Sequence, residues 1–139
     1  FIIDLNLKLK KDISIINIAR QRKIFLITIR DNAKKVNFFK KKGFKIILVN
    51  SLSSKKDFKK MFQYVYKLGY CRAFFETGLT FLNVLFKYKL LNILYVIQSN
   101  IMLKKIGLNN SSSHYLKKIK LNKKIKINLI NDSLYKKEF

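Results

Sequence analysis

The sequence predicts an α/β fold in which a mostly parallel sheet is followed by antiparallel strands. Two observations support this prediction. Between residues 24 and 89, short apolar runs alternate with stretches whose apolar residues recur at helical spacing, and parallel neighbours need such helical crossovers. After residue 90 the alternation stops, and apolar runs are separated by polar turns. That pattern is typical of antiparallel pairing at the edge of a sheet.

Three apolar runs, 1–3, 24–29 and 44–49, predict the first strands. The run 24–29 is short, apolar and rich in β-branched residues, so we expect a strand that is buried on both faces. A helix over 32–42 is expected to join it to the next strand. The residues that define this helix are the cap candidates Asp31 and Asn32, the inward-facing Val36 and Phe39, and Gly43 just past its end.

A second helix is predicted after the polar run 50–54, because Ser54 and Asp57 have the spacing of a capping box. Its apolar face consists of Phe58, Met61, Phe62 and Val65, and Gly69 is expected to end it. We then expect a third parallel strand over 70–75, with Cys71, Phe74 and Phe75 in the core, and a helix over 79–89. The inward residues of this last helix are Leu82, Leu85 and Phe86.

The C-terminal part is predicted to contain three strands, over 93–97, 125–130 and 133–139, with a turn at Asn131-Asp132. The polar segment 109–113 is predicted to be a loop. Because the chain opens directly on an apolar run, we expect a single partial domain over 1–139 whose N-terminal part is missing.

The composition gives a net charge of +24, from 31 Lys and Arg against 7 Asp and Glu. Such a charge is compatible with a nucleic-acid-binding protein. However, the abundance of Lys, Asn, Ile, Phe and Tyr and the absence of Pro and Trp also indicate a genome rich in A and T, which raises the charge of any protein. We therefore interpret Lys117, Lys118, Lys120, Lys123, Lys124 and Lys126 as a solvated face and consider nucleic acid an unlikely partner.

Cysteine and hydropathy limit the location of the protein. Cys71 is the only cysteine, so no intrachain disulfide can form and a cytoplasmic location is expected. Cys71 and His114 are each solitary, which argues against a zinc site. No apolar run approaches the length of about 20 residues that spans a bilayer, so no membrane association is expected.

The turn Glu76-Thr77-Gly78 is the candidate site, because ligands of open α/β sheets bind where a strand end leads into a helix. Gly78 allows close approach of a ligand to the backbone, and the amides that open the next helix can bind phosphate. Thr80 adds a hydroxyl. The alternative is that Glu76 only caps the helix.

Residues 67–82, which read KLGYCRAFFETGLTFL, resemble the riboflavin-biosynthesis pyrimidine reductases. In that family a helix ends in Gly, an apolar strand follows, and a Glu, a small residue and a Gly then open a helix. The similarity extends to a strand ending in Asp4, to the helix, Gly and strand at 41–47, and to the strand entry at 90–96. It covers only the later part of the reductase domain.

The resemblance implies a three-layer α/β fold like that of dihydrofolate reductase, a homodimer, and NADPH as cofactor. The implied reaction is the reduction of 5-amino-6-(5-phosphoribosylamino)uracil to its ribitylamino product. Glu76 would contact the substrate, and no catalytic acid is identified. The residues implied for the NADPH site are Leu5, Gly78, Leu79, Thr80, Phe81, Leu82, Asn83 and Val84.

Five positions depart from the family pattern. Thr77 replaces a small residue, Leu5 a small polar one, Asn92-Ile93 an acidic pair, and Asn100 the usual Pro. Thr77 would narrow the pocket, and Leu5 would contribute only its backbone. Two alternatives stay open: an inactive relative of the reductase, which Asn92-Ile93 and Thr77 suggest, and a basic nucleic-acid-binding protein associated with the ribosome, which the net charge of +24 suggests.

Overall fold

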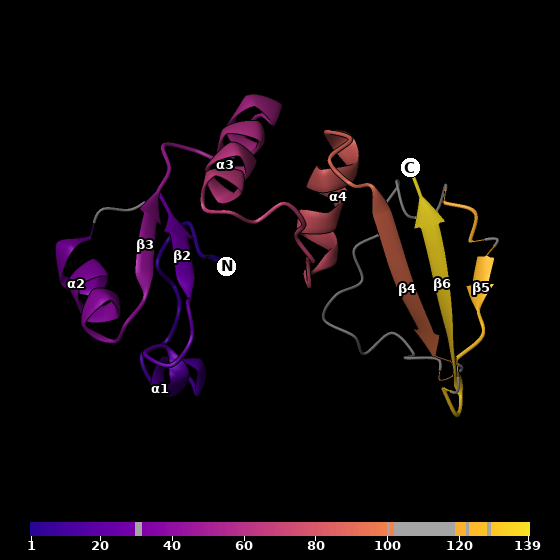
Figure 1. Ribbon diagram of the computed structural model, residues 1–139, viewed down its shortest axis with the longest axis horizontal. Coiled ribbons are helices and arrows are strands. Elements are labelled where there is room, and N and C mark those ends of the chain that lie inside the picture. Colours follow the sequence, from indigo (N-terminus) through magenta and orange to yellow (C-terminus); the bar gives the residue numbers. More distant parts are fainter. Residues whose placement is uncertain (30–31, 100, 102–118, 122, 128) are drawn as a thin grey trace. The chain divides into compact units, whose positions relative to one another are not determined.

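The computed structural model describes residues 1–29, 32–99, 101, 119–121, 123–127 and 129–139. The chain forms two compact units, Phe1–Arg72 and Ala73–Phe139, which we call the N-terminal and the C-terminal unit (Figure 1). Each contains its own three-stranded sheet, parallel in the first and antiparallel in the second. The predicted mixture of parallel and antiparallel strands in an α/β chain is confirmed.

The N-terminal unit is built on β1 (Ile2–Ile3), β2 (Phe25–Thr28) and β3 (Lys45–Leu48), in that spatial order. All four residues of β2 are buried, as the uninterrupted apolar run predicts for a central strand. Lys45 N–H donates to Ile24 O at 2.8 Å and Val49 N–H to Thr28 O at 2.9 Å, extending the pairing of β2 and β3 at both ends.

The main core of this unit lies between the sheet and the helix α2 (Ala33–Lys41), which lies beside β3 (Figure 1). The short helix α1 (Ile15–Ile18), which the sequence did not predict, contributes Ile16. The core residues are Leu7, Ile16, Ala19, Ile24, Leu26, Val36, Phe39 and Phe44. Fully burying one Leu or Phe side chain contributes roughly 1.5–3 kcal/mol, so this cluster is the principal stabilising element of the unit.

The predicted helix caps are confirmed. The Asn32 side chain accepts a hydrogen bond from Lys35 N–H at 3.2 Å at the start of α2. Helix α3 (Lys55–Lys67) opens on a complete capping box between Ser54 and Asp57. Gly43 and Gly69 end the two helices at φ +99° and +92°, the left-handed conformation that glycine adopts without steric cost.

The predicted strand over 70–75 is wrong. No helix or strand occupies residues 70–78, Cys71 is exposed, and 83% of Phe74 is accessible to solvent. A strand forms only where a neighbour accepts its backbone hydrogen bonds, and no described strand pairs with this run. Its apolar residues instead serve local packing, since the ring of Tyr70 packs edge-on against Phe1 at 5.2 Å between ring centroids.

The C-terminal unit contains helix α4 (Leu79–Lys87) and the strands β4 (Ile93–Ser99), β5 (Lys123–Ile125) and β6 (Asp132–Glu138). Leu85 of α4 is fully buried, and Phe86 packs against Phe139 at 5.3 Å between ring centroids. Leu82 and Phe86 are half-buried. The antiparallel spatial order of the strands is β4-β6-β5, which Figure 1 shows as three adjacent arrows.

Three expectations for this unit need correction. The antiparallel strands form a sheet of their own that includes β4, rather than an edge added to the parallel sheet. The strand expected over 125–130 lies at Lys123–Ile125, and Asp132 belongs to β6 rather than to the turn before it. Pairing with β6 selects these residues, and periodicity along one strand carries no information about its partner. The loop expected at 109–113 lies outside the described residues.

Candidate functional site

The turn 76–78 leads directly into α4, as expected. Gly78 is the N-cap residue, with extended backbone at φ −74° and ψ 167°, and its carbonyl accepts the N–H of Leu82 at 3.1 Å. The amides that precede this first closed turn have no acceptor within the helix and point out of its end. The turn therefore presents backbone donors and the positive end of the helix dipole to an anion.

Gly78 leaves this helix end open. Its φ of −74° is accessible to any residue, so glycine is not required here for backbone conformation. A Cβ placed at Gly78 would meet no other atom within 4 Å. The contribution of glycine is therefore the space above the first amides of α4, into which a ligand can approach the backbone.

Glu76 and Thr77 are both exposed. The Thr77 hydroxyl lies 3.4 Å from the carbonyl oxygen of Gly78. No side chain caps α4, so the alternative interpretation of Glu76 as a helix cap is not realised. Because Glu76 is exposed, its carboxylate is accessible to a substrate that donates hydrogen bonds.

Seven of the eight residues that the resemblance assigned to the cofactor lie in α4 or at its N-cap. Gly78, Leu79 and Thr80 surround the open end of α4, and Thr80 is exposed. Phe81 is the third residue of α4, and its ring lies 6.2 Å from that of Phe75 between centroids. The remaining three residues, Leu82, Asn83 and Val84, are half-buried further along the helix.

Leu5 lies in the N-terminal unit, where its backbone carbonyl is engaged. It accepts the Thr28 hydroxyl at 3.1 Å and the Ile29 N–H at 3.2 Å, which ties the turn after β1 to the end of β2. Asp4 stabilises the same turn, because its carboxylate accepts the Leu9 N–H at 2.6 Å. Both residues hold the backbone at the carboxyl end of the parallel sheet.

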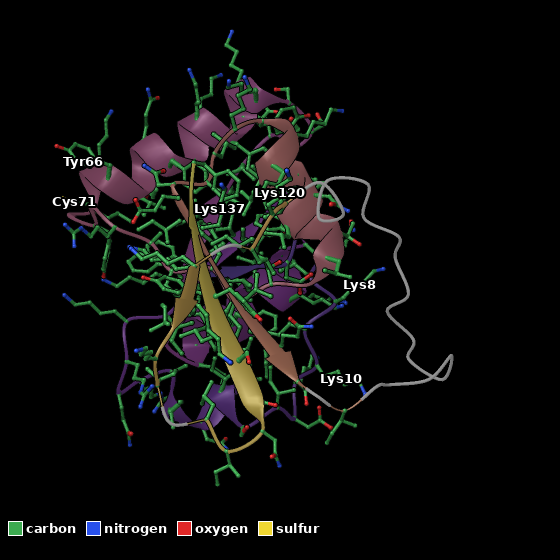
Figure 2. All side chains as sticks on the ribbon, turned by 90° about the vertical axis from the view of Figure 1, so that its right-hand side faces the viewer. Lys8, Lys10, Tyr66, Cys71, Lys120 and Lys137 are labelled. Atoms are coloured by element: carbon green, nitrogen blue, oxygen red, sulfur yellow. The ribbon has the colours of Figure 1, made fainter. Side chains whose placement is uncertain are left out.

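A second candidate binding site was not predicted from the sequence. A hollow of about 230 Å³ in the C-terminal unit is lined by Lys120, Lys123, Lys136, Lys137 and Glu138; Figure 2 labels Lys120 and Lys137 near the C-terminal end of β6. Lys120 and Lys123 were interpreted as part of a solvated face. The pairing of β5 with β6 brings them to two further lysines, which only the long-range register reveals.

Two of the residues that line this hollow, Lys136 and Glu138, form an ion pair. Lys136 Nζ lies 2.5 Å from Glu138 Oε1. This hydrogen bond, together with the attraction between the two charges, raises the pKa of Lys136 and lowers the pKa of Glu138. Both groups are therefore held in their charged forms.

Among the described residues, no three His, Cys, Asp or Glu side chains gather as a metal site, and no described helix is long and apolar enough to cross a membrane. The position of His114 lies outside the described residues. The chain matches no model of a known protein family, and no curated protein is detectably similar to it.

Proposed function

We propose that the chain is the later part of a dimeric, cytoplasmic, NADPH-dependent reductase of the riboflavin pathway, which reduces phosphoribosylaminouracil to its ribitylamino product. The observation that carries this proposal is the turn Glu76-Thr77-Gly78, which opens α4 with unobstructed space at Gly78. The resemblance of the sequence around this turn to the family also supports the proposal. This support rests on the turn and on the helix that follows, since residues 70–75 form no strand.

The residues at the start of α4 fit a cofactor phosphate. Backbone amides at a helix N-terminus bind phosphate oxygens without any basic side chain. The exposed Thr80 hydroxyl adds a further donor one residue into the helix. Gly78 places no side chain of its own beside these donors, and the position of its absent Cβ has no other atom within 4 Å.

In the proposed reaction NADPH supplies the hydride, and the protein binds and orients the reactants. Glu76 accepts hydrogen bonds from amino or hydroxyl groups of the substrate, since an ionised carboxylate is an acceptor only. Its place two residues before Gly78 keeps the substrate contact next to the cofactor contact. Orientation by such fixed groups lowers the entropic part of the barrier.

The proposal is tested with the purified full-length protein. NADPH oxidation, followed by absorbance, should require the phosphoribosylaminouracil substrate. Glu76→Gln should lower kcat or raise KM while NADPH binding, measured by fluorescence, is retained. Gly78→Val should weaken NADPH binding about tenfold or more, because one hydrogen bond to a charged group is worth roughly 1.5–3 kcal/mol.

The variant Gly78→Val separates binding from folding, because its backbone angle and surroundings accommodate a side chain. Thr77→Ser is the matched control at the neighbouring exposed position and should bind NADPH normally. Normal turnover by a Glu76→Gln, Gly78→Val double variant would exclude the turn from the mechanism. A correctly folded protein that fails to bind NADPH would identify the inactive relative instead.

A further inference from the structure

One face of the antiparallel sheet carries exposed side chains. Tyr95 of β4 lies directly opposite Lys136 of β6, which in turn lies opposite Lys123 of β5. Directly paired residues project from the same face of a sheet, so these three side chains form a row across it. The next residue of β4 on this face is Ile97. Tyr95 and Ile97 are 47% and 66% exposed, so the part of the chain that the structure describes leaves both side chains accessible on this face.

The lysine-lined hollow includes Lys123 and Lys136 of this row. β5 begins its pairing at Lys123, opposite Lys136, so Lys137 and Glu138 are paired with β4 alone. The sheet narrows there from three strands to two, and Lys120 approaches from the segment that precedes β5. The result is a notch at the sheet edge, which we call the lysine notch, lined by Lys120, Lys123, Lys136, Lys137 and Glu138.

The charges of the lysine notch are unbalanced. Four of the five residues that line the hollow of about 230 Å³ are lysines and one is a glutamate, a formal net charge of +3. Lys123 and Lys136 are direct cross-strand partners, and like charges in that arrangement repel. Glu138 contacts Lys136 but is itself 67% exposed, and an exposed ion pair of this kind stabilises little. An anion between the lysines would relieve the repulsion.

We propose that the lysine notch binds the phosphate groups of single-stranded nucleic acid, with the exposed ring of Tyr95 as a stacking surface for a base. Lysine is a point charge without the fork geometry of arginine, so it holds phosphate without reading sequence. A row of lysines ending in an exposed aromatic ring is the combination that binds single strands, whose bases are available for stacking. In a duplex, the bases are already stacked and paired. This surface is independent of the proposed reductase activity.

Binding is tested on the full chain with a fluorescently labelled oligo-uridine, by anisotropy over a series of salt concentrations. The variant K123Q/K136Q removes the two facing lysines, and K59Q/K60Q, on the exposed surface of α3, removes the same charge elsewhere. Each phosphate contact on a single strand contributes about 0.7 to the slope of log K against log salt. K123Q/K136Q should therefore lower the magnitude of the slope by about 1.4, and K59Q/K60Q should leave it unchanged. Equal losses for the two variants would overturn the proposal, because general charge would then explain binding.

Tyr95 provides the second arm of the experiment. Tyr95→Ala should weaken binding roughly tenfold, in the range measured for loss of one base–aromatic stack, and Tyr95→Phe should bind as the parent does. Circular dichroism of each variant checks that the sheet is retained. Unaffected binding by folded Tyr95→Ala would contradict the stacking role.

Two competitors identify the ligand class. Unlabelled oligo-uridine should displace the labelled strand, and uridine monophosphate at the same nucleotide concentration should displace little, because it engages one phosphate only. Displacement by poly-glutamate as effective as by oligo-uridine would assign the lysine notch to an acidic polypeptide and overturn the proposal. Equal displacement by uridine monophosphate would show that the lysine notch binds a single phosphate, and this result would also overturn the nucleic-acid assignment.

Discussion

Gly43 and Gly69 end successive helices in the same left-handed conformation, yet their surroundings differ. At Gly43, a Cβ would lie 3.0 Å from Ala19 O and 3.0 Å from both Cα and Cγ of Arg20. At Gly69, a Cβ would meet nothing within 4 Å. We therefore expect Gly43→Ala to destabilise the N-terminal unit more than Gly69→Ala, although both replace a glycine at positive φ.

The magnitudes follow from two separate costs. A non-glycine residue in the left-handed region costs about 1–2 kcal/mol, and this cost applies to both variants. Forcing an atom into a packed contact costs typically a further 1–3 kcal/mol, and this applies to Gly43→Ala alone, since two of its three close neighbours are backbone atoms. Gly43→Ala should thus lose about 2–5 kcal/mol and Gly69→Ala about 1–2 kcal/mol.

Urea unfolding followed by far-UV circular dichroism measures both variants against the parent. The midpoint should fall for both, with unchanged slope, and fall further for Gly43→Ala. In a thermal scan, each kcal/mol corresponds to about 4–8 °C for a unit of this size. Equal midpoints for the two variants would refute the packing argument, because the shared conformational cost would then be the whole effect.

Three further results are expected, two for the N-terminal unit and one that compares a residue of each unit. Ser54→Ala removes the hydroxyl that accepts the Asp57 N–H at 3.2 Å and should lower the unfolding free energy by about 1 kcal/mol, measured in urea. Hydrogen bonds from Ser51 and Ser54 lower the pKa of Asp57 below its ordinary 3.8. The stability that the ionised Asp57 carboxylate contributes is therefore present above pH 3.8 and is lost as the pH falls below it. An Asp57→Asn variant should show a shallower acid transition in a titration followed by circular dichroism. Phe39→Ala, at a residue only 1% exposed, should lower the unfolding free energy by about 3–5 kcal/mol. Phe74→Ala, on the exposed segment, should change it by no more than about 0.5 kcal/mol. Similar losses for the two variants in urea would contradict the assigned burial.

Local sequence signals predicted the helices of this protein well. Asn32, Ser54 and Asp57 form the caps that their types and spacing indicated, and Gly43 and Gly69 end the helices. These devices act over at most one helical turn, so the residues that determine them are neighbours in the sequence. The start of α4 at Leu79, and with it the open turn at Gly78, is predictable for the same reason.

Apolar runs predicted strands at the fully buried β2 and also at the partly exposed β3 and β4, but they did not distinguish runs that pair from a run that does not. The β-branched run 24–29 contains the central strand β2, whose four residues are all buried. The run 70–75 is also mostly apolar but has no strand beside it in the described chain. Apolar composition indicates that a segment can join a sheet, and a partner strand decides whether it does.

The sequence by itself determined the caps and ends of the helices, the central buried strand and the identity of the turn before α4, because each depends on residues close together along the chain. Only the tertiary structure decided that the antiparallel strands form a sheet of their own and that Lys123 faces Lys136 across it. Cross-strand register joins segments with no fixed separation in sequence, and a shift by one residue exchanges the two faces. The lysine notch is a product of that register.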